Sequence, residues 1–193
     1  LNLCVRNLEN ISALDKINND TLLAEVCMAA KYEGDSIKTR YTPYQQKYDD
    51  SPSQICTMLA RSFADIGDIV RGRDLYRGDN REKTKLENNL KTIFKNIYDN
   101  LKDKEAKKHY KKDDKDPNYY KLREDWWNAN RETVWKAITC GAKVGDTYFR
   151  QTCGGDNGTF SQANDKCRCQ KKNGKDDADQ VPTYFDYVPQ YLR

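Results

Sequence analysis

The sequence lacks features on which many enzymes, membrane-spanning proteins and nucleic-acid binders depend. It has one histidine in 193 residues, and its 34 basic and 30 acidic side chains nearly balance, for a net charge of +4. His109 lies in the basic stretch 107–112, where an exposed side chain without a role is favoured over a general base. No apolar run approaches the ~18–20 residues that cross a bilayer. The mild charge does not indicate a dedicated nucleic-acid binder.

Hydrophobic residues are also scarce. They make up 37% of the chain and charged residues 33%, against about 45–50% and about 25% in ordinary domains. That composition alone favours disorder, but 13 Tyr, 5 Phe and 3 Trp are too many for a solvated tail. We therefore expect one folded domain, or most of one, with a modest core, a polar surface and long loops.

The cysteines are dispersed along the chain, as expected of a disulfide framework in an oxidising compartment. All seven are disulfide candidates: Cys4, Cys27, Cys56, Cys140, Cys153, Cys167 and Cys169. Incidental thiols of a cytosolic protein are one alternative. A zinc site is another, but Cys167-Arg-Cys169 lacks the C-x-x-C spacing of a zinc ribbon, and we expect no metal and no cofactor. The odd count predicts a cysteine whose partner lies outside this sequence, as in a fragment.

Apolar residues at helical spacing predict four helices. Their expected bounds are from Asp20, as N-cap, to Gly34; from Ser53 to Gly72; from about Arg81 to about Tyr110; and from after Pro117 to about Ile138. Their expected buried faces contain Leu22, Val26, Ala29 and Ala30; Ile55, Leu59, Phe63, Ile66 and Val70; Leu86, Leu90, Ile93, Ile97 and Leu101; and Leu122, Trp126, Trp127, Val134, Ala137 and Ile138. A polar loop with Pro43 and Pro52 is expected between the first two helices.

The last fifty residues have a different character. Gly, Asn, Asp and Lys dominate 141–181, which predicts a long loop restrained by disulfides through its cysteines. The segment from Thr183 is expected to open a further helix, with Pro189 in its first turn. No segment alternates apolar and polar residues, so little sheet is expected. The predicted fold class is all-α, a disulfide-stapled helical bundle with long polar loops.

A lysine-rich stretch at 101–112 is the best candidate for binding. On a helix, Lys104, Lys107, Lys108 and Lys111 would lie along one side and could hold the sulfates of a glycosaminoglycan through salt-sensitive contacts. The candidate contacts are Lys102, Lys104, Lys107, Lys108, Lys111 and Lys112, with Lys171 and Lys172 in a second, looser cluster. Because acidic residues lie alongside, a solvated charged face without a ligand is the alternative.

One pair of acids needs an interpretation of its own. Asp65 and Asp68 are three residues apart and share a helix face. We interpret them as part of a polar face that contacts Arg61, Arg71 or Arg73, in preference to an acid–base pair.

Several blocks of the sequence resemble a known family. They are 3–34, 60–72 (ARSFADIGDIVRG), 74–76, 122–131 (LREDWWNANR), 134–140, 167–169 and 181–193 (VPTYFDYVPQYLR). In this order they are similar to the alpha-class Duffy-binding-like domains of Plasmodium falciparum erythrocyte membrane protein 1. The resemblance covers essentially the whole chain.

This resemblance implies a function. It makes 1–193 a partial domain, the middle one of three subdomains, without the N-terminal and C-terminal parts. It implies an adhesion module of a variant antigen on the infected red cell, anchored in the membrane elsewhere and met by host antibodies, with no enzymatic activity and no nucleic-acid partner. The implied receptors in rosetting and cytoadherence are a glycosaminoglycan such as heparan sulfate or a glycoprotein on red cells or endothelium. A non-binding, antigenically variable spacer is the rival.

Overall fold

The computed structural model describes residues 3–48, 53–74, 80–111, 116–154, 159–171, 173–175, 177 and 180–193. Its elements are α1 (Arg6–Glu9), η1 (Leu14–Lys16), α2 (Asn19–Tyr48), α3 (Ser53–Arg71), α4 (Asn80–Asp99), α5 (Lys104–His109), α6 (Tyr120–Ile138), β1 (Gln151–Gly154), β2 (Phe160–Gln162), η2 (Phe185–Tyr187) and η3 (Gln190–Leu192). The all-α prediction is confirmed, since a single two-stranded sheet is the only one in the described residues. None of the described helices is apolar over a length that would cross a bilayer.

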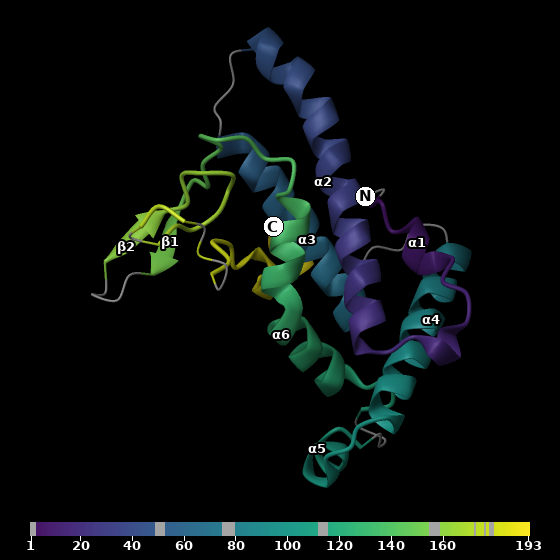
Figure 1. Ribbon diagram of the computed structural model, residues 1–193. Helices are drawn as coiled ribbons and strands as arrows, with labels where there is room; N and C mark the ends of the chain where they lie inside the picture. The colour runs from purple at the N-terminus through teal and green to yellow at the C-terminus, as the bar shows by residue number, and fades with distance from the viewer. Residues whose placement is uncertain are drawn as a thin grey trace.

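Three helices form the centre of the molecule. The long helix α2 packs against α3 and α6, and α3 packs against α6 (Figure 1). Helix α4 lies to one side, in contact with α1, η1 and α6, while the β1–β2 hairpin projects on the other side. The C-terminal segment returns to α3, where η2 packs. Residues far apart in the sequence, α3 and 180–193, are therefore neighbours in space.

The predicted apolar faces form the core. Nearly all of their residues are buried, and only Leu101 and Ala137 are partly exposed. The Phe63 ring packs 5.1 Å from the Trp127 ring and 5.2 Å from the Trp135 ring, measured between centroids. A buried side chain of this size contributes roughly 1.5–3 kcal/mol. The core thus combines the aliphatic faces of the helices with a cluster of large aromatic side chains.

Helix α2 begins two positions earlier than predicted. The Thr21 N–H donates to the Asn18 side-chain oxygen at 2.9 Å, and the Asn18 N–H donates to Thr21 Oγ1 at 2.8 Å. This reciprocal pair satisfies two amide groups that the first turn of a helix leaves without partners. Asn18, and not Asp20, therefore caps α2.

The prediction that Gly34 ends the first helix is wrong. Helix α2 continues through it to Tyr48, so the polar loop expected around Pro43 is also wrong, while Pro52 lies outside the described residues. Gly34 is buried where α2 crosses the end of α6, and a Cβ atom there would overlap the carbonyl oxygen of Ile138. This glycine is required by close helix packing and does not act as a helix terminator.

Helix α3 ends as predicted. Gly72 follows its last residue with a φ of +72°, a left-handed conformation that glycine adopts without steric penalty. The Arg73 N–H then donates to the Asp68 carbonyl at 2.8 Å, which satisfies a carbonyl in the last turn of the helix.

The predicted third helix is two helices. Helix α4 ends at Asp99, and α5 begins at Lys104. Asp103 adopts an extended conformation, and its side chain accepts from the N–H groups of Glu105 and Ala106 at 2.8 and 2.9 Å. This strong N-cap starts a new helix and so competes with continuation of α4.

The long loop predicted at 141–181 contains the β1–β2 hairpin, an antiparallel pair with a register shift between Gln151 and Cys153. The further helix expected from Thr183 is present as two single turns of 3₁₀-helix, η2 and η3. Pro189 sits at the N-cap of η3, where the proline ring removes no helical hydrogen bond.

Candidate functional site

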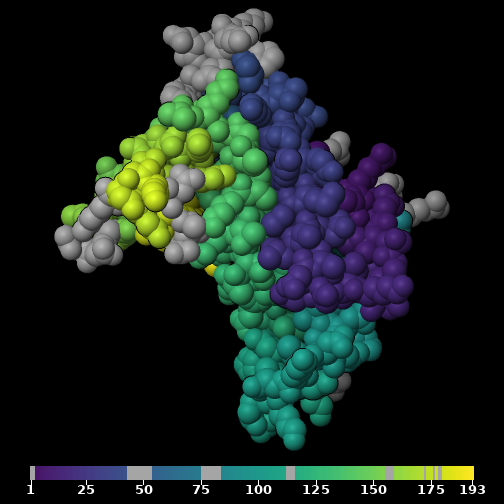
Figure 2. All heavy atoms as spheres, in the orientation of Figure 1, coloured from purple at the N-terminus to yellow at the C-terminus, as the bar shows by residue number. Residues whose placement is uncertain are grey.

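The lysine-rich stretch forms one end of the molecule. Helix α5 and its flanking residues project beyond the point where α4 and α6 converge (Figures 1 and 2). None of its residues is buried. We call residues 101–111 the α5 tip.

The α5 tip is attached to the helices above it by a few polar contacts. Lys107 Nζ donates to the Asp99 carbonyl at 2.9 Å and lies 5.7 Å from the centroid of the Tyr98 ring. The Tyr110 hydroxyl donates to Asp125 on α6 at 2.7 Å, and this hydrogen bond is the main cause of the raised pKa of the tyrosine. Lys107 therefore positions α5, although the sequence suggested a ligand contact.

The structure brings together part of the predicted lysine-rich stretch. Lys102, Lys104, Lys108 and Lys111 are exposed at the tip, whereas Lys112 lies outside the described residues. Lys104, Lys107 and Lys108 share one side of α5, as expected, but Lys111 lies beyond the end of the helix at His109. Lys102 and Lys111 flank this short helix at its two ends.

The second lysine cluster is remote from the tip. Lys171 is exposed in the C-terminal loop and lies 3.9 Å from Asp177, while Lys172 is outside the described residues. In Figure 1 that loop lies on the side of the β1–β2 hairpin, away from α5. The two predicted clusters therefore do not form one surface.

The side chain of His109 is exposed, with its ring 4.7 Å from that of Tyr110. In the part of the chain that the structure describes, no group of three His, Cys, Asp or Glu side chains could hold a metal ion. Cys167 and Cys169, considered above for a zinc site, therefore belong to no such group in the described residues.

Two disulfides secure the C-terminal loop. Cys56 on α3 bonds to Cys167, 111 residues away, and Cys153 on β1 bonds to Cys169. The two cysteines of Cys167-Arg-Cys169 thus pair with different elements, one tying the loop to the bundle and the other closing the hairpin region. The prediction that disulfides restrain this loop is confirmed.

Three of the seven disulfide candidates are free thiols: Cys4, Cys27 and Cys140. Burial raises the pKa of Cys27. Burial and the neighbouring Glu33 carboxylate raise the pKa of Cys4. These two thiols are thereby held in the protonated, less reactive form, while Cys140 is exposed at the end of α6.

A buried ionic network joins the C-terminal segment to the bundle. Asp186 is 2% exposed and accepts from Arg131 at 2.7 and 2.8 Å and from the Trp127 indole at 2.9 Å. Arg71, 1% exposed, donates to Asp68 at 3.0 Å and to the Asp186 carbonyl. We call these five side chains the buried frame. Sequence reasoning missed Asp186, because its partners lie more than fifty residues away.

The paired acids predicted on a polar face are in fact buried. Asp65 and Asp68 are 6% and 4% exposed. Asp68 pairs with Arg71, as one of the predicted alternatives had it, and both acids pair with Arg193. Burial raises the pKa of both carboxyl groups, and the positive charge of Arg193 opposes that shift. They fix the C-terminal segment against α3.

Arg123 makes a second internal anchor. It is fully buried, and its guanidinium donates to both carboxylate oxygens of Glu87 at 2.8 and 3.0 Å. It also donates to the carbonyls of Val70 and Ile69 at 2.6 and 3.1 Å. One side chain on α6 therefore satisfies the last turn of α3 and holds α4 in place.

Comparisons with known proteins identify the family of this chain. The model of the Duffy binding domain matches residues 1–193. A search of curated proteins finds no significant match.

Solved structures of PfEMP1 domains are similar to this chain over nearly its whole length. The NTS-DBL1-alpha and CIDR-gamma double domain of PfEMP1 from the Plasmodium falciparum varO strain is 41% identical, with a TM-score of 0.77. The NTS-DBL1(alpha-1) domain of that strain is 43% identical, with a TM-score of 0.74. The PfEMP1 IT4var13 DBLbeta domain bound to ICAM-1 is 32% identical, with a TM-score of 0.68. Each match covers 98% of this chain. In the same order, the matches cover 25%, 39% and 40% of the solved chains, so this chain spans less than half of each.

Proposed function

The chain belongs to the Duffy-binding domain family, and on this premise we propose that it is a host-cell adhesion module, without enzymatic activity, of a variant parasite surface antigen. The match of the family over all 193 residues is the observation that carries the proposal. In this proposal the chain is the middle part of a larger adhesion domain, displayed on the outer face of the infected red cell by a membrane anchor elsewhere in the protein. Host antibodies would meet it there.

We propose that the chain belongs to the alpha class, on two numerical comparisons. The identities of 41% and 43% to the two alpha-type structures exceed the 34% and 32% to two DBLbeta structures. The same order holds for the TM-scores, 0.77 and 0.74 against 0.66 and 0.68.

The proposed receptor chemistry is a sulfated glycan such as heparan sulfate, in rosetting or cytoadherence. Four exposed lysines project from the α5 tip, and residues 102–111 contain five lysines against Asp103 and Glu105. Charges on a protrusion are accessible to a long polyanion and attract it through contacts that salt weakens. A host glycoprotein is the second candidate, because a DBLbeta relative is solved bound to ICAM-1.

Retention on a heparin column tests this receptor chemistry. We expect the variant Lys102→Gln/Lys104→Gln/Lys108→Gln/Lys111→Gln to elute at markedly lower salt than the unaltered chain. The control variant removes the same charge elsewhere, through Lys31→Gln/Lys38→Gln/Lys136→Gln/Lys143→Gln on α2 and at the opposite end of α6. If both variants elute together, the α5 tip is not the site.

The rival function, a non-binding and antigenically variable spacer, makes a different prediction. A spacer binds neither red cells nor glycans, whereas an adhesion module binds at least one of them as an isolated chain. Binding of the 193-residue chain to red cells and to a glycan array therefore discriminates between the two functions. Failure to bind either would favour the spacer.

A further inference from the structure

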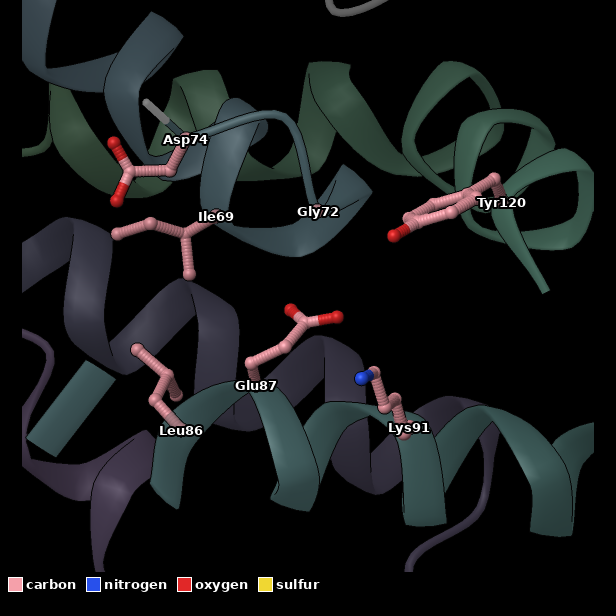
Figure 3. Close-up of a pocket in the computed structure, with 7 residues that line it drawn as sticks. All are labelled: Ile69, Gly72, Asp74, Leu86, Glu87, Lys91 and Tyr120. Carbon is pink, nitrogen blue, oxygen red and sulfur yellow. The ribbon is translucent and has the colours of Figure 1, made fainter. Parts of the chain in front are cut away.

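A cavity of about 180 Å³ lies between the end of α3, the middle of α4 and the start of α6. Figure 3 shows its lining: Ile69, Gly72, Asp74, Leu86, Glu87, Lys91 and Tyr120. A single water needs only about 10–15 Å³ of such space, so the cavity has room for several waters. That space suits one sugar ring or one large side chain.

The cavity has a mixed end and a polar end. Ile69, Leu86 and the Asp74 carboxylate lie at the first, and the Tyr120 hydroxyl, the Glu87 carboxylate and the Lys91 ammonium converge at the second (Figure 3). Tyr120 is 40% exposed. Apolar contacts with a few convergent polar groups are typical of small-ligand sites.

The fold holds the walls of the cavity rigidly. The Glu87 carboxylate is fixed by its two bonds from Arg123, whose guanidinium also stacks 5.7 Å from the centroid of the Tyr120 ring. At Gly72 a Cβ atom would lie 2.7 Å from the Tyr120 ring, so the absence of a side chain there sets the ring position. Asp74 is held by a bond of 3.1 Å from Gln190.

The charges of the lining define the ligand. The ionised carboxylates of Asp74 and Glu87 can only accept hydrogen bonds, so a ligand beside them must bring hydroxyl or amide donors. Lys91 can only donate, and among the described residues its ammonium has no ion pair or hydrogen bond. The site therefore matches a compact polyhydroxylated ring that carries one negative group.

We propose that this cavity binds one anionic sugar unit, a sugar ring with a carboxylate or a sulfate, with Lys91 as the partner of its negative charge. The sugar hydroxyls donate to Asp74 and Glu87, and the C–H groups of the ring lie against Ile69 and Leu86. The proposal rests on the adhesion function and deepens it. The α5 tip attracts the polyanion through charge alone, and the cavity recognises one unit of it.

The positions of the two sites fit this division. Lys91 and Asp99 lie on the same helix, eight residues apart, which corresponds to about 12 Å along its axis. Helix α4, which contributes Lys91 to the lining of the cavity, runs toward the α5 tip (Figure 1). One extended glycan chain can therefore contact both.

Ligand-observed NMR with the 193-residue chain tests the proposal, using methyl glucuronide, glucose 6-sulfate and neutral methyl glucoside. We expect at least one anionic sugar to bind about tenfold more tightly than the neutral one. The Lys91→Gln variant should abolish this difference. The control Lys95→Gln, one turn further along α4 at an exposed lysine paired with Asp99, should preserve it. The stronger of the two anionic ligands identifies a carboxylated or a sulfated sugar.

Three results would overturn the proposal: no binding of either anionic sugar, equal binding of the neutral sugar, or an anionic preference that survives Lys91→Gln. The α5 tip variant separates this failure from failure of the adhesion function. It should bind the single sugar as the unaltered chain does while losing retention on heparin. If sugar binding fails and heparin retention persists, the adhesion function stands without this cavity.

Discussion

The buried frame and the α5 tip use charged side chains in opposite ways. In the frame, Arg71, Arg131 and Asp186 are at most about a tenth exposed, and each meets a partner from another part of the chain. At the tip, Lys104 and Lys108 are exposed on a six-residue helix. Removing one member of a buried pair leaves an uncompensated charge, whereas an exposed lysine is already solvated.

This difference separates folding from recognition. The frame joins α3, α6 and the C-terminal segment, so its charges determine the architecture. The tip is attached mainly through Lys107 and Tyr110, so its remaining charges can change with little effect on the bundle.

The largest effect is expected from Asp186→Ala in the frame. It leaves the Arg131 guanidinium and the Trp127 indole without their acceptor in a buried site, which should lower the free energy of unfolding by about 3–5 kcal/mol. Urea denaturation measures it. Glu105→Ala at the tip is the matched removal of an acid and should cost less than about 0.5 kcal/mol. Equal losses would erase the distinction between the two regions.

A smaller effect is expected from Gly34→Ala, where α2 meets α6. Alanine is a better helix former by about 1 kcal/mol, yet its methyl group would overlap the Ile138 carbonyl. We expect a net loss of about 1–3 kcal/mol, because two packed helices must move apart. Gly154→Ala is the control, since nothing lies within 4 Å of a Cβ atom there. A stabilised Gly34 variant would contradict the close approach.

A still smaller and local effect is expected from Asp103→Ala at the tip. Loss of its two N-cap hydrogen bonds should destabilise α5 by about 1 kcal/mol. Amide exchange within 104–109 should accelerate, while the midpoint of global unfolding stays unchanged. Asp20→Ala, an exposed acid in the first turn of α2 that does not cap it, should leave α5 exchange unaltered. A shift of the global midpoint would show that the tip is part of the frame.

The smallest effect concerns pH. Burial raises the pKa of Asp65 in the folded state despite the opposing charge of Arg193, so the folded chain binds that proton more tightly than the unfolded chain. The stabilisation from this group is then fully present below its unfolded pKa of about 3.9 and is lost as pH rises through the folded pKa. The stability of the unaltered chain relative to Asp65→Asn should fall as the pH rises above about 4. A rise would mean that Arg193 dominates.

Much of the bundle could be predicted from local sequence. The stripe from Ile55 to Val70 identified α3 and its buried face, and Gly72 marked its end. These signals lie within one element, and helical periodicity records which face is buried. The break at Asp103 was equally local, but an apolar seam running through Leu101 concealed it.

Features that depend on distant partners could not be predicted. Gly34 resembles a helix terminator until α6 is seen to cross it. The same holds for Asp186, which is an ordinary tail residue in the sequence and the centre of the frame in the structure. The seven cysteines predicted a disulfide framework, but the separate partners of Cys167 and Cys169 required the fold.

The division of charge between frame and tip is tested most directly by the salt dependence of heparan sulfate affinity, measured by calorimetry up to about 0.15 M ionic strength. The unaltered chain should lose affinity steeply as salt rises. The variant with Lys102, Lys104, Lys108 and Lys111 changed to Gln should bind weakly, show little salt dependence and unfold at the same urea concentration. A variant that keeps the full salt dependence would contradict the account. So would a variant that unfolds at a clearly lower urea concentration than the unaltered chain.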